Sequence, residues 1–122
     1  MRIFKTKSFH RWTKEVALDD INLALAVHEM TQGLYDANLG GHIYKKRVSI
    51  WNRGKRDGAR TIIAFKTRDK AIFIYGYAKN KRSNITTKEE EALKELAAVY
   101  FSYDESQINQ AIKLGELIEV QS

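Results

Sequence analysis

The stretch that decides the fold is IYKKRVSIW at residues 43–51, followed by RTIIAFKT at residues 60–67 and AIFIYGYA at residues 71–78. These segments are rich in β-branched and aromatic residues, which favour strands. In the first segment Val48 and Ile50 alternate with polar residues, so one face is predicted to meet a core and the other to carry charge. The third segment is apolar over most of its length, which is typical of the buried centre of a sheet. Short connections favour antiparallel pairing of the three strands.

Helices are predicted on both sides of these strands. A short strand over residues 1–5 precedes a short helix, and a second helix begins at Asp19 and Asp20, whose charges suit a helix N-terminus. Residues 52–59 contain glycine and basic residues and are predicted to form a loop. After the strands, Thr87 with Glu90 predicts a capping box for a third helix, and Asp104 with Gln107 predicts the start of a fourth. Helices, then a three- to four-stranded sheet, then helices make an α+β fold, and the length predicts a single domain over residues 1–122.

The second helix carries apolar residues on two stripes. A helix that is apolar over so much of its circumference is either sandwiched in the core or partly covered by a partner, and the core arrangement is the commoner one. One stripe holds Leu23, Val27, Met30 and Leu34, and the other holds Ile21, Ala24, Leu25 and His28.

Positive charge is concentrated in the strand region. Residues 45–82 contain 13 Lys or Arg and two acidic residues, whereas residues 83–122 contain three basic and eight acidic residues. The formal net charge of +6 therefore conceals a sharp segregation. A segregated basic sheet is typical of a nucleic-acid-binding surface, and a merely solvated charged surface is the plainer alternative.

The composition excludes several classes of chemistry. The chain has no cysteine, so disulfides, thiolate zinc sites and a cysteine nucleophile are impossible. No cluster of His, Asp and Glu has the spacing of metal ligands, and no glycine-rich phosphate-binding motif is present, so we expect neither a metal nor another cofactor. No apolar run approaches the roughly 18 residues of a membrane span, which favours a cytoplasmic protein without a membrane partner.

Candidate functional residues lie at the ends of the predicted strands. If the three strands are adjacent, cations that bind phosphates and tyrosine rings that stack on bases converge on one surface. A guanidinium fixed by a sheet is suited to stabilise the charge that develops on phosphorus during RNA cleavage. We assign candidate catalytic roles to Arg60, Lys55, Tyr77 and Lys79. Candidate RNA-binding roles are assigned to Lys45, Lys46, Arg47, Arg53, Lys81 and Arg82.

The general acid and base are harder to assign. Histidine is the usual choice near neutral pH, but His10, His28 and His42 are poorly placed relative to the basic strands. Tyr77, or a lysine whose pKa is depressed by neighbouring cations, is the alternative. Each lysine can equally be a phosphate clamp, and Tyr77 can equally be a packing residue.

The order of motifs along the chain resembles the RelE/HigB-like toxins of bacterial type II toxin–antitoxin systems, within the RelE/ParE superfamily. The resemblance rests on DANLGG at residues 36–41, KKRV at 45–48, YGYAKN at 75–80 and GELIEV at 115–120. It implies a RelE-like fold with N-terminal helices packed on an antiparallel sheet and helices following it. It also implies a metal-independent endoribonuclease, an mRNA interferase, that cleaves translated mRNA on the ribosome and is neutralised by a cognate antitoxin. By position, Arg60 matches the arginine that such toxins use at the scissile phosphate. The resemblance also makes Arg82 a candidate for the role of a second phosphate-contacting arginine, which some members have late in the sheet.

Two other functions stay open at this point. ParE relatives share the fold and inhibit gyrase, but they generally lack a basic catalytic surface. A non-catalytic RNA- or DNA-binding module would use the same charge for binding alone, with a strong salt dependence.

Overall fold

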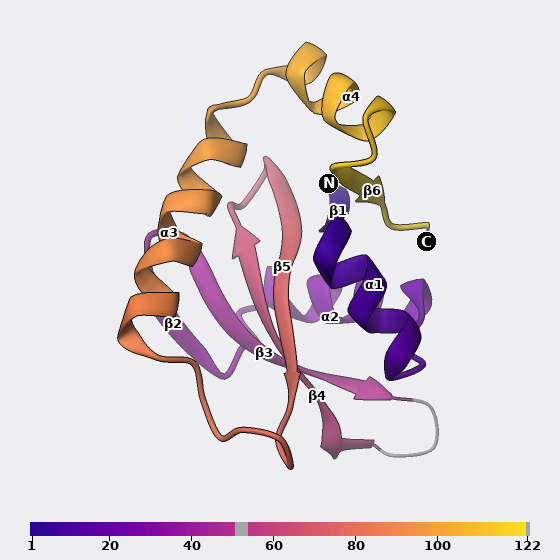
Figure 1. The fold of residues 1–122 in the computed structure, drawn as a ribbon, viewed down its shortest axis with the longest axis vertical. Helices are drawn as coiled ribbons and strands as arrows, with labels where there is room; N and C mark the ends of the chain where they lie inside the picture. Colours follow the sequence, from indigo (N-terminus) through magenta and orange to yellow (C-terminus); the bar gives the residue numbers. More distant parts are fainter. Residues whose placement is uncertain (51–53, 122) are drawn as a thin grey trace.

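The computed structural model describes residues 1–50 and 54–121. The elements run in the order β1 (Arg2–Thr6), α1 (Lys7–Glu15), α2 (Asp20–Thr31), β2 (Ala37–Gly40), β3 (Ile43–Ile50), β4 (Gly54–Phe65), β5 (Lys70–Ala78), α3 (Thr87–Ser102), α4 (Glu105–Lys113) and β6 (Leu117–Glu119). The strands form one sheet in the order β2-β3-β4-β5-β1-β6 (Figure 1). All neighbouring pairs are antiparallel except β1 and β5, which are parallel. The α+β class is confirmed.

The predicted count of three to four strands is too low, because the sheet has six strands among the described residues. β2 was not foreseen because it is only four residues long and ends in glycine, so its strand conformation depends on pairing with β3. β6 is only three residues long and becomes a strand by pairing with β1. Both strands are specified by their neighbours more than by their own composition.

Two local boundaries also differ from the prediction. The expected loop over residues 52–59 is wrong from residue 54 onward, because β4 begins at Gly54, and residues 52 and 53 lie outside the described residues. Its glycines are typical of a turn, but the backbone pairs with β3 across a register shift between Val48 and Ile50. The capping box of α3 lies one residue earlier than predicted: Thr86 accepts from the Glu89 N–H, and the Glu89 carboxylate accepts from the Thr86 N–H.

Each face of the sheet is covered by a different pair of helices. The face that carries Val48, Ile63 and Phe73 packs against α1 and α2, and α2 lies behind the sheet in Figure 1. The opposite face, with Ile43 and Ile62, packs against α3 and α4. Alternation along the strands therefore builds two cores, one on each side of the sheet.

The two apolar stripes of α2 differ in how far they are buried. Leu23, Val27 and Met30 are buried in the first core. Ile21 and Leu25, from the other stripe, remain 72% and 53% exposed. Leu34, the fourth member of the first stripe, lies beyond the end of α2 and is 52% exposed. The core expectation thus holds for three of the four residues of one stripe.

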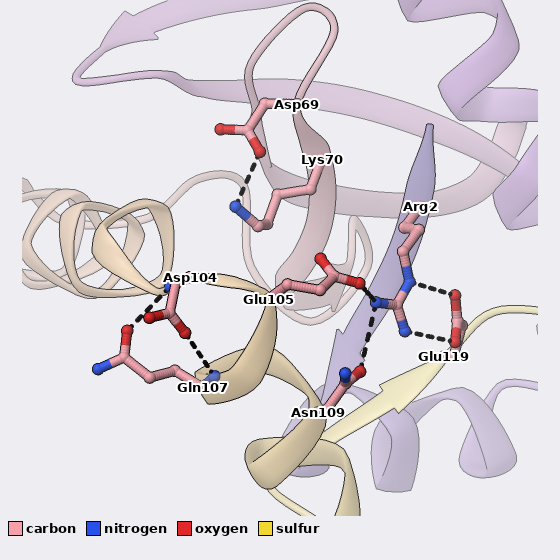
Figure 2. A network of polar contacts seen from close by, with 8 residues as sticks. All are labelled: Arg2, Asp69, Lys70, Asp104, Glu105, Gln107, Asn109 and Glu119. Atoms are coloured by element: carbon pink, nitrogen blue, oxygen red, sulfur yellow. Dashed lines mark hydrogen bonds and ion pairs between the residues drawn. The ribbon is translucent and has the colours of Figure 1, made fainter.

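A polar network joins the two ends of the described chain (Figure 2). The Arg2 guanidinium on β1 donates to both carboxylate oxygens of Glu119 on β6, at 2.9 and 3.0 Å. It also forms an ion pair with Glu105 at the start of α4 and donates to Asn109 at 3.5 Å. The Arg2 hydrogen bond outweighs burial and lowers the pKa of Glu119. One arginine therefore connects β1, β6 and α4.

Replacement of Gly76 by alanine is expected to destabilise the protein by about 2 kcal/mol through overpacking. Gly76 lies on β5 directly beneath the indole of Trp12, and a Cβ there would lie 2.2 Å from the Trp12 Cζ3 atom. In a Trp12→Ala background the same change is expected to cost less than about 1 kcal/mol, because the colliding ring is gone. Urea unfolding of the four proteins measures both values, and equal costs in the two backgrounds would refute the contact as the cause.

Candidate active site

The register of three adjacent strands aligns the candidate residues in two rows. Arg47 on β3 pairs with Arg60 on β4, which pairs with Tyr77 on β5. One step further along the strands, Lys45 pairs with Ile62, which pairs with Tyr75. Because paired residues share a face of a sheet, both rows lie on the side covered by α3. The predicted adjacency of the three strands is confirmed.

Arg60 lies at the middle of the first row and is largely buried, with 9% of its surface exposed. Its Nη1 donates to the carbonyl oxygen of Gly58 at 3.3 Å. Within the described residues it has no carboxylate partner, so most of its hydrogen-bonding capacity is uncommitted. A guanidinium of this kind is held in place by the sheet and keeps donors for an incoming anion.

Tyr77 is buried at the end of the same row. Burial raises the pKa of its phenol, and the positive charges of Arg60 and Arg82 oppose that rise without cancelling it. The phenol is therefore protonated at neutral pH. In that state it can donate a proton or a hydrogen bond, but it cannot serve as a general base.

Arg47, at the other end of the row, is held by Asp36. The Asp36 carboxylate accepts from the Arg47 backbone N–H at 2.6 Å and from its Nε at 3.0 Å. Nearly half of the Arg47 side chain is exposed. The ion pair therefore orients Arg47 while leaving part of its guanidinium open to solvent.

Arg82, which follows β5, donates hydrogen bonds from almost all of its side-chain N–H groups. Its Nε donates to the Asn84 carbonyl oxygen at 2.9 Å, and Nη1 donates to the Tyr75 hydroxyl at 2.9 Å. Glu89 at the start of α3 accepts from Nη1 at 3.0 Å and from Nη2 at 2.5 Å. Four of its five N–H groups thus have partners in the described part of the chain.

These hydrogen bonds keep the Glu89 carboxylate ionised beside the Arg82 guanidinium. The Arg82 hydrogen bond, aided by the Thr86 N–H, lowers the pKa of Glu89 to about 2. The Arg82 guanidinium also lies 5.9 Å from the Tyr77 ring centre and 6.0 Å from that of Tyr75. Arg82 therefore connects the start of α3 to the two tyrosines of the rows.

Lys45 completes the second row from the β3 side. Its Nζ donates to the Asn84 Oδ1 at 2.9 Å, and the same oxygen accepts from the Ile85 N–H at 2.8 Å. The connection between β5 and α3 is thus tied back to the sheet by both Lys45 and Arg82.

The structure does not bring all the predicted residues together. Lys46 lies on the opposite face, 4% exposed, with its Nζ 2.8 Å from the Glu29 carboxylate of α2. Lys79 and Lys81 are exposed in the turn after β5 instead of continuing the strand. Arg53 lies outside the described residues, as does the side chain of Lys55, whose backbone belongs to β4.

Histidine does not contribute to the two rows. His10 lies on α1, and burial lowers the pKa of its imidazole. His28 is exposed on α2 behind the sheet. His42 precedes β3 at the end remote from Arg47, where its ring meets Phe101 of α3 at 5.7 Å. Among the described residues, no group of three His, Cys, Asp or Glu could hold a metal ion.

Three functional partners were missed by sequence reasoning: Asp36, Asn84 and Glu89. Asp36 and Asn84 lie 11 and 39 residues from Arg47 and Lys45, so no local spacing indicates those contacts. Glu89 lies seven residues from Arg82, on the far side of the connection from β5 to α3. Asp36 does open the DANLGG segment, which is the one signal that could have drawn attention to it.

Comparison with known proteins gives one match. The family model described as the RelE toxin of the RelE / RelB toxin–antitoxin system matches residues 1–120. A search of the curated proteins gave no match. None of the helices in the described ranges has the length and apolar character needed to cross a membrane. The match extends over both helical layers, the whole sheet and both rows of candidate residues, and the chain therefore belongs to the RelE toxin family.

Proposed function

We propose that this toxin is an mRNA endonuclease that cleaves translated messages on the ribosome and so inhibits translation in the cytoplasm. Its family makes it the toxin of a toxin–antitoxin system, with a cognate antitoxin as partner. The observation that carries the proposal is the row Arg47–Arg60–Tyr77, which sets two guanidinium groups and a neutral phenol side by side on one face of the sheet.

In the proposed reaction, the 2′-hydroxyl oxygen of the RNA attacks the neighbouring phosphorus. The new O2′–P bond forms as the P–O5′ bond breaks, and the 2′ proton must leave while O5′ gains one. Negative charge develops on the non-bridging oxygens, where the uncommitted N–H groups of Arg60 can bind it. The protonated phenol of Tyr77 is suited to supply the proton to O5′.

The flanking cations have supporting roles in this scheme. Lys45 and Arg47 lie beside Arg60 and can bind phosphates on either side of the scissile one. Arg82 retains one N–H without a partner in the described residues, so we assign it mainly to positioning Tyr75 and the start of α3. Lys55 and Lys79 remain candidates for the group that removes the 2′ proton, and Lys81 and Arg53 for contacts with more distant phosphates.

The proposal is tested by adding the purified toxin to a bacterial translation extract and mapping mRNA ends by primer extension. New 5′ ends within translated codons are expected, and they should be absent when the same mRNA is incubated with toxin but without ribosomes. Cleavage of naked mRNA would support the nuclease activity but would refute the requirement for ribosomes. An intact message would refute cleavage, and gyrase inhibition would be assayed next.

Lys45 and Lys46 are adjacent in sequence and are expected to differ in RNA binding. Lys45→Met should reduce the slope of log K against log salt by about 0.7 for a single-stranded oligonucleotide, because one phosphate contact is lost. Lys46→Met should leave the slope unchanged, because Lys46 is buried on the opposite face. Fluorescence anisotropy between about 50 and 200 mM salt measures both slopes. A smaller slope for Lys46→Met than for Lys45→Met would reverse the assignment.

A further inference from the structure

A hollow of about 370 Å³ lies between the start of α1 and the inner face of α3. In Figure 1 these two helices lie on either side of β5. The register of the sheet places the hollow close to the second row of candidate residues. Lys5 on β1 is opposite Phe73 on β5, so the chain enters α1 at about the level of Tyr75. The lining consists of Thr6, Lys7, Ser8, Arg11, Leu96, Tyr100 and Glu116.

Lys7 and Arg11 give this hollow a positive charge that is not neutralised by neighbouring groups. Both residues are exposed, and neither side chain has a hydrogen-bond or ion-pair partner in the described part of the chain. They are four residues apart on one helix and therefore lie on the same face of it. Among the described residues of the lining the only acid is Glu116, which forms an ion pair with neither cation. Two such cations on one face favour binding of an anion such as a phosphate group.

At Ser8 the hollow continues into a second cavity, a groove of about 640 Å³ between α1 and β5. The lining of this groove is largely apolar and aromatic, with Trp12 and Val16 on α1 and Tyr75 and Tyr77 on β5. The groove therefore connects the hollow to residues of both rows.

The charges along the groove offset one another. Glu15 contributes a negative charge to the lining, and Lys81 contributes a positive one. Arg82 also reaches the groove, but its guanidinium is already paired with Glu89. A neutral, flat group is therefore better suited to the groove than a phosphate.

A cationic hollow that opens into an aromatic groove fits single-stranded RNA. An RNA strand carries a phosphate beside every flat, neutral base, and proteins bind such strands by combining cations with aromatic stacking surfaces. From Tyr75 to Tyr77 the strand rises about 6.7 Å, which is comparable to the length of one nucleotide in an extended strand. An acidic peptide could pair with Lys7 and Arg11 but would gain little from the stacking surface.

We propose that α1 extends the candidate active site and binds the RNA strand beyond the scissile phosphate. Lys7 and Arg11 hold a phosphate in the hollow, and a neighbouring base stacks in the groove against Trp12. These three residues bind substrate and take no part in bond cleavage. The inference rests on the proposed RNA-cleaving function, and it is tested with RNA that cannot be cleaved, so that each can fail separately.

The phosphate contact is tested by the salt dependence of binding to a single strand of 2′-O-methyl RNA, in which the attacking hydroxyl is blocked. Lys7→Met combined with Arg11→Met is expected to reduce the slope of log K against log salt by about 0.7, the value for one phosphate. Lys14→Met combined with Lys113→Met removes the same charge from exposed positions outside the hollow and should leave the slope unchanged. Fluorescence anisotropy measures both slopes, and thermal unfolding checks that both variants are folded. Equal slopes for the two double variants would overturn the proposal.

Stacking is tested through the emission of Trp12, one of two tryptophans in the chain. In a Trp51→Phe background, Trp12 is the only tryptophan, and its fluorescence is expected to fall when the same oligonucleotide binds. Unchanged emission at saturating oligonucleotide would overturn the proposal. Equal quenching by a polyglutamate peptide would assign the hollow and groove to an acidic polypeptide and would also overturn it.

The two sets of results separate this inference from the proposed function. Cleavage of mRNA in the translation extract, without the change in slope or the quenching, would support the nuclease and refute the binding site on α1. Both binding responses with an intact message would support the binding site and refute cleavage.

Discussion

Arg60→Ala is expected to lower the rate of RNA cleavage about 10²- to 10³-fold while most of the RNA affinity is retained. Arg60 lies at the centre of the row and has uncommitted donors, so its loss removes stabilisation that matters most in the transition state. Lys45 and Arg47 remain to bind the flanking phosphates. The measurement is single-turnover cleavage of ribosome-bound mRNA at saturating toxin, together with oligonucleotide binding by anisotropy.

Arg68→Ala is the matched control for this experiment. Arg68 is exposed in the turn between β4 and β5, at the opposite end of those strands from Arg60. The Arg68→Ala variant is expected to cleave RNA at close to the rate of the unmodified toxin. If Arg60→Ala cleaved within about threefold of the control, a difference well under 1 kcal/mol in the barrier, the assignment of Arg60 to the transition state would be wrong. A parallel loss of affinity and rate would instead indicate a binding role.

The alternation of side chains made the two rows predictable from sequence. With residues 43–51, 60–67 and 71–78 as adjacent strands, the apolar positions of Val48 and Ile50 place Lys45 and Arg47 on the opposite face of the sheet. The same alternation directs Lys46 toward the core, and its burial against Glu29 follows from that pattern. The error lay in assigning function by charge alone within a strand.

Other features could not be read from the sequence because they depend on tertiary pairing. Nothing local in residues 37–40 indicates a strand, since β2 exists only through its hydrogen bonds to β3. The engagement of Arg82 by Glu89 depends on where α3 begins relative to the sheet, and a shift of one residue in its cap would change the partner. Sequence thus predicted the cations of the site, and the structure was needed to find which of them are already paired.

Asp20→Ala is expected to destabilise the fold by about 3 kcal/mol at pH 7. The Asp20 carboxylate lies 2.7 Å from the ammonium of Lys5, a residue of β1 that is almost entirely buried, and it also accepts from the Gln121 N–H at 2.8 Å. Removing the carboxylate leaves a buried cation without its partner, which is more costly than losing an exposed ion pair. Urea unfolding followed by circular dichroism measures the change.

Asp19→Ala provides the comparison, since it removes the neighbouring carboxylate. Asp19 caps α2 by accepting from the Asn22 N–H at 3.2 Å, and its loss is expected to cost about 1 kcal/mol. Equal losses for the two variants would show that the Lys5 contact adds nothing beyond the helix terminus.

The Asp20 carboxylate also predicts that the stability of the fold depends on pH. Burial would raise the pKa of Asp20, but the hydrogen bonds from Lys5 and Gln121 outweigh burial and lower it. A lowered pKa in the folded state means that the contribution to stability is complete above the unfolded value of about 4 and is lost as the pH falls through the folded value. The difference in unfolding free energy between the unmodified protein and Asp20→Ala should therefore shrink below about pH 4, and a constant difference down to pH 2 would contradict this account.

The position of β1 between β5 and β6 has a consequence for biosynthesis. Strands β3, β4 and β5 are joined by local antiparallel pairings and can assemble while the chain is still being made. β1, by contrast, can pair with β5 only after residue 70, the partner of residue 2, has been synthesised. It can pair with β6 only after residue 119, the partner of residue 4, has been synthesised. A nascent chain halted before residue 117 would thus expose one edge of β1, and the complete sheet forms only after translation has passed that point.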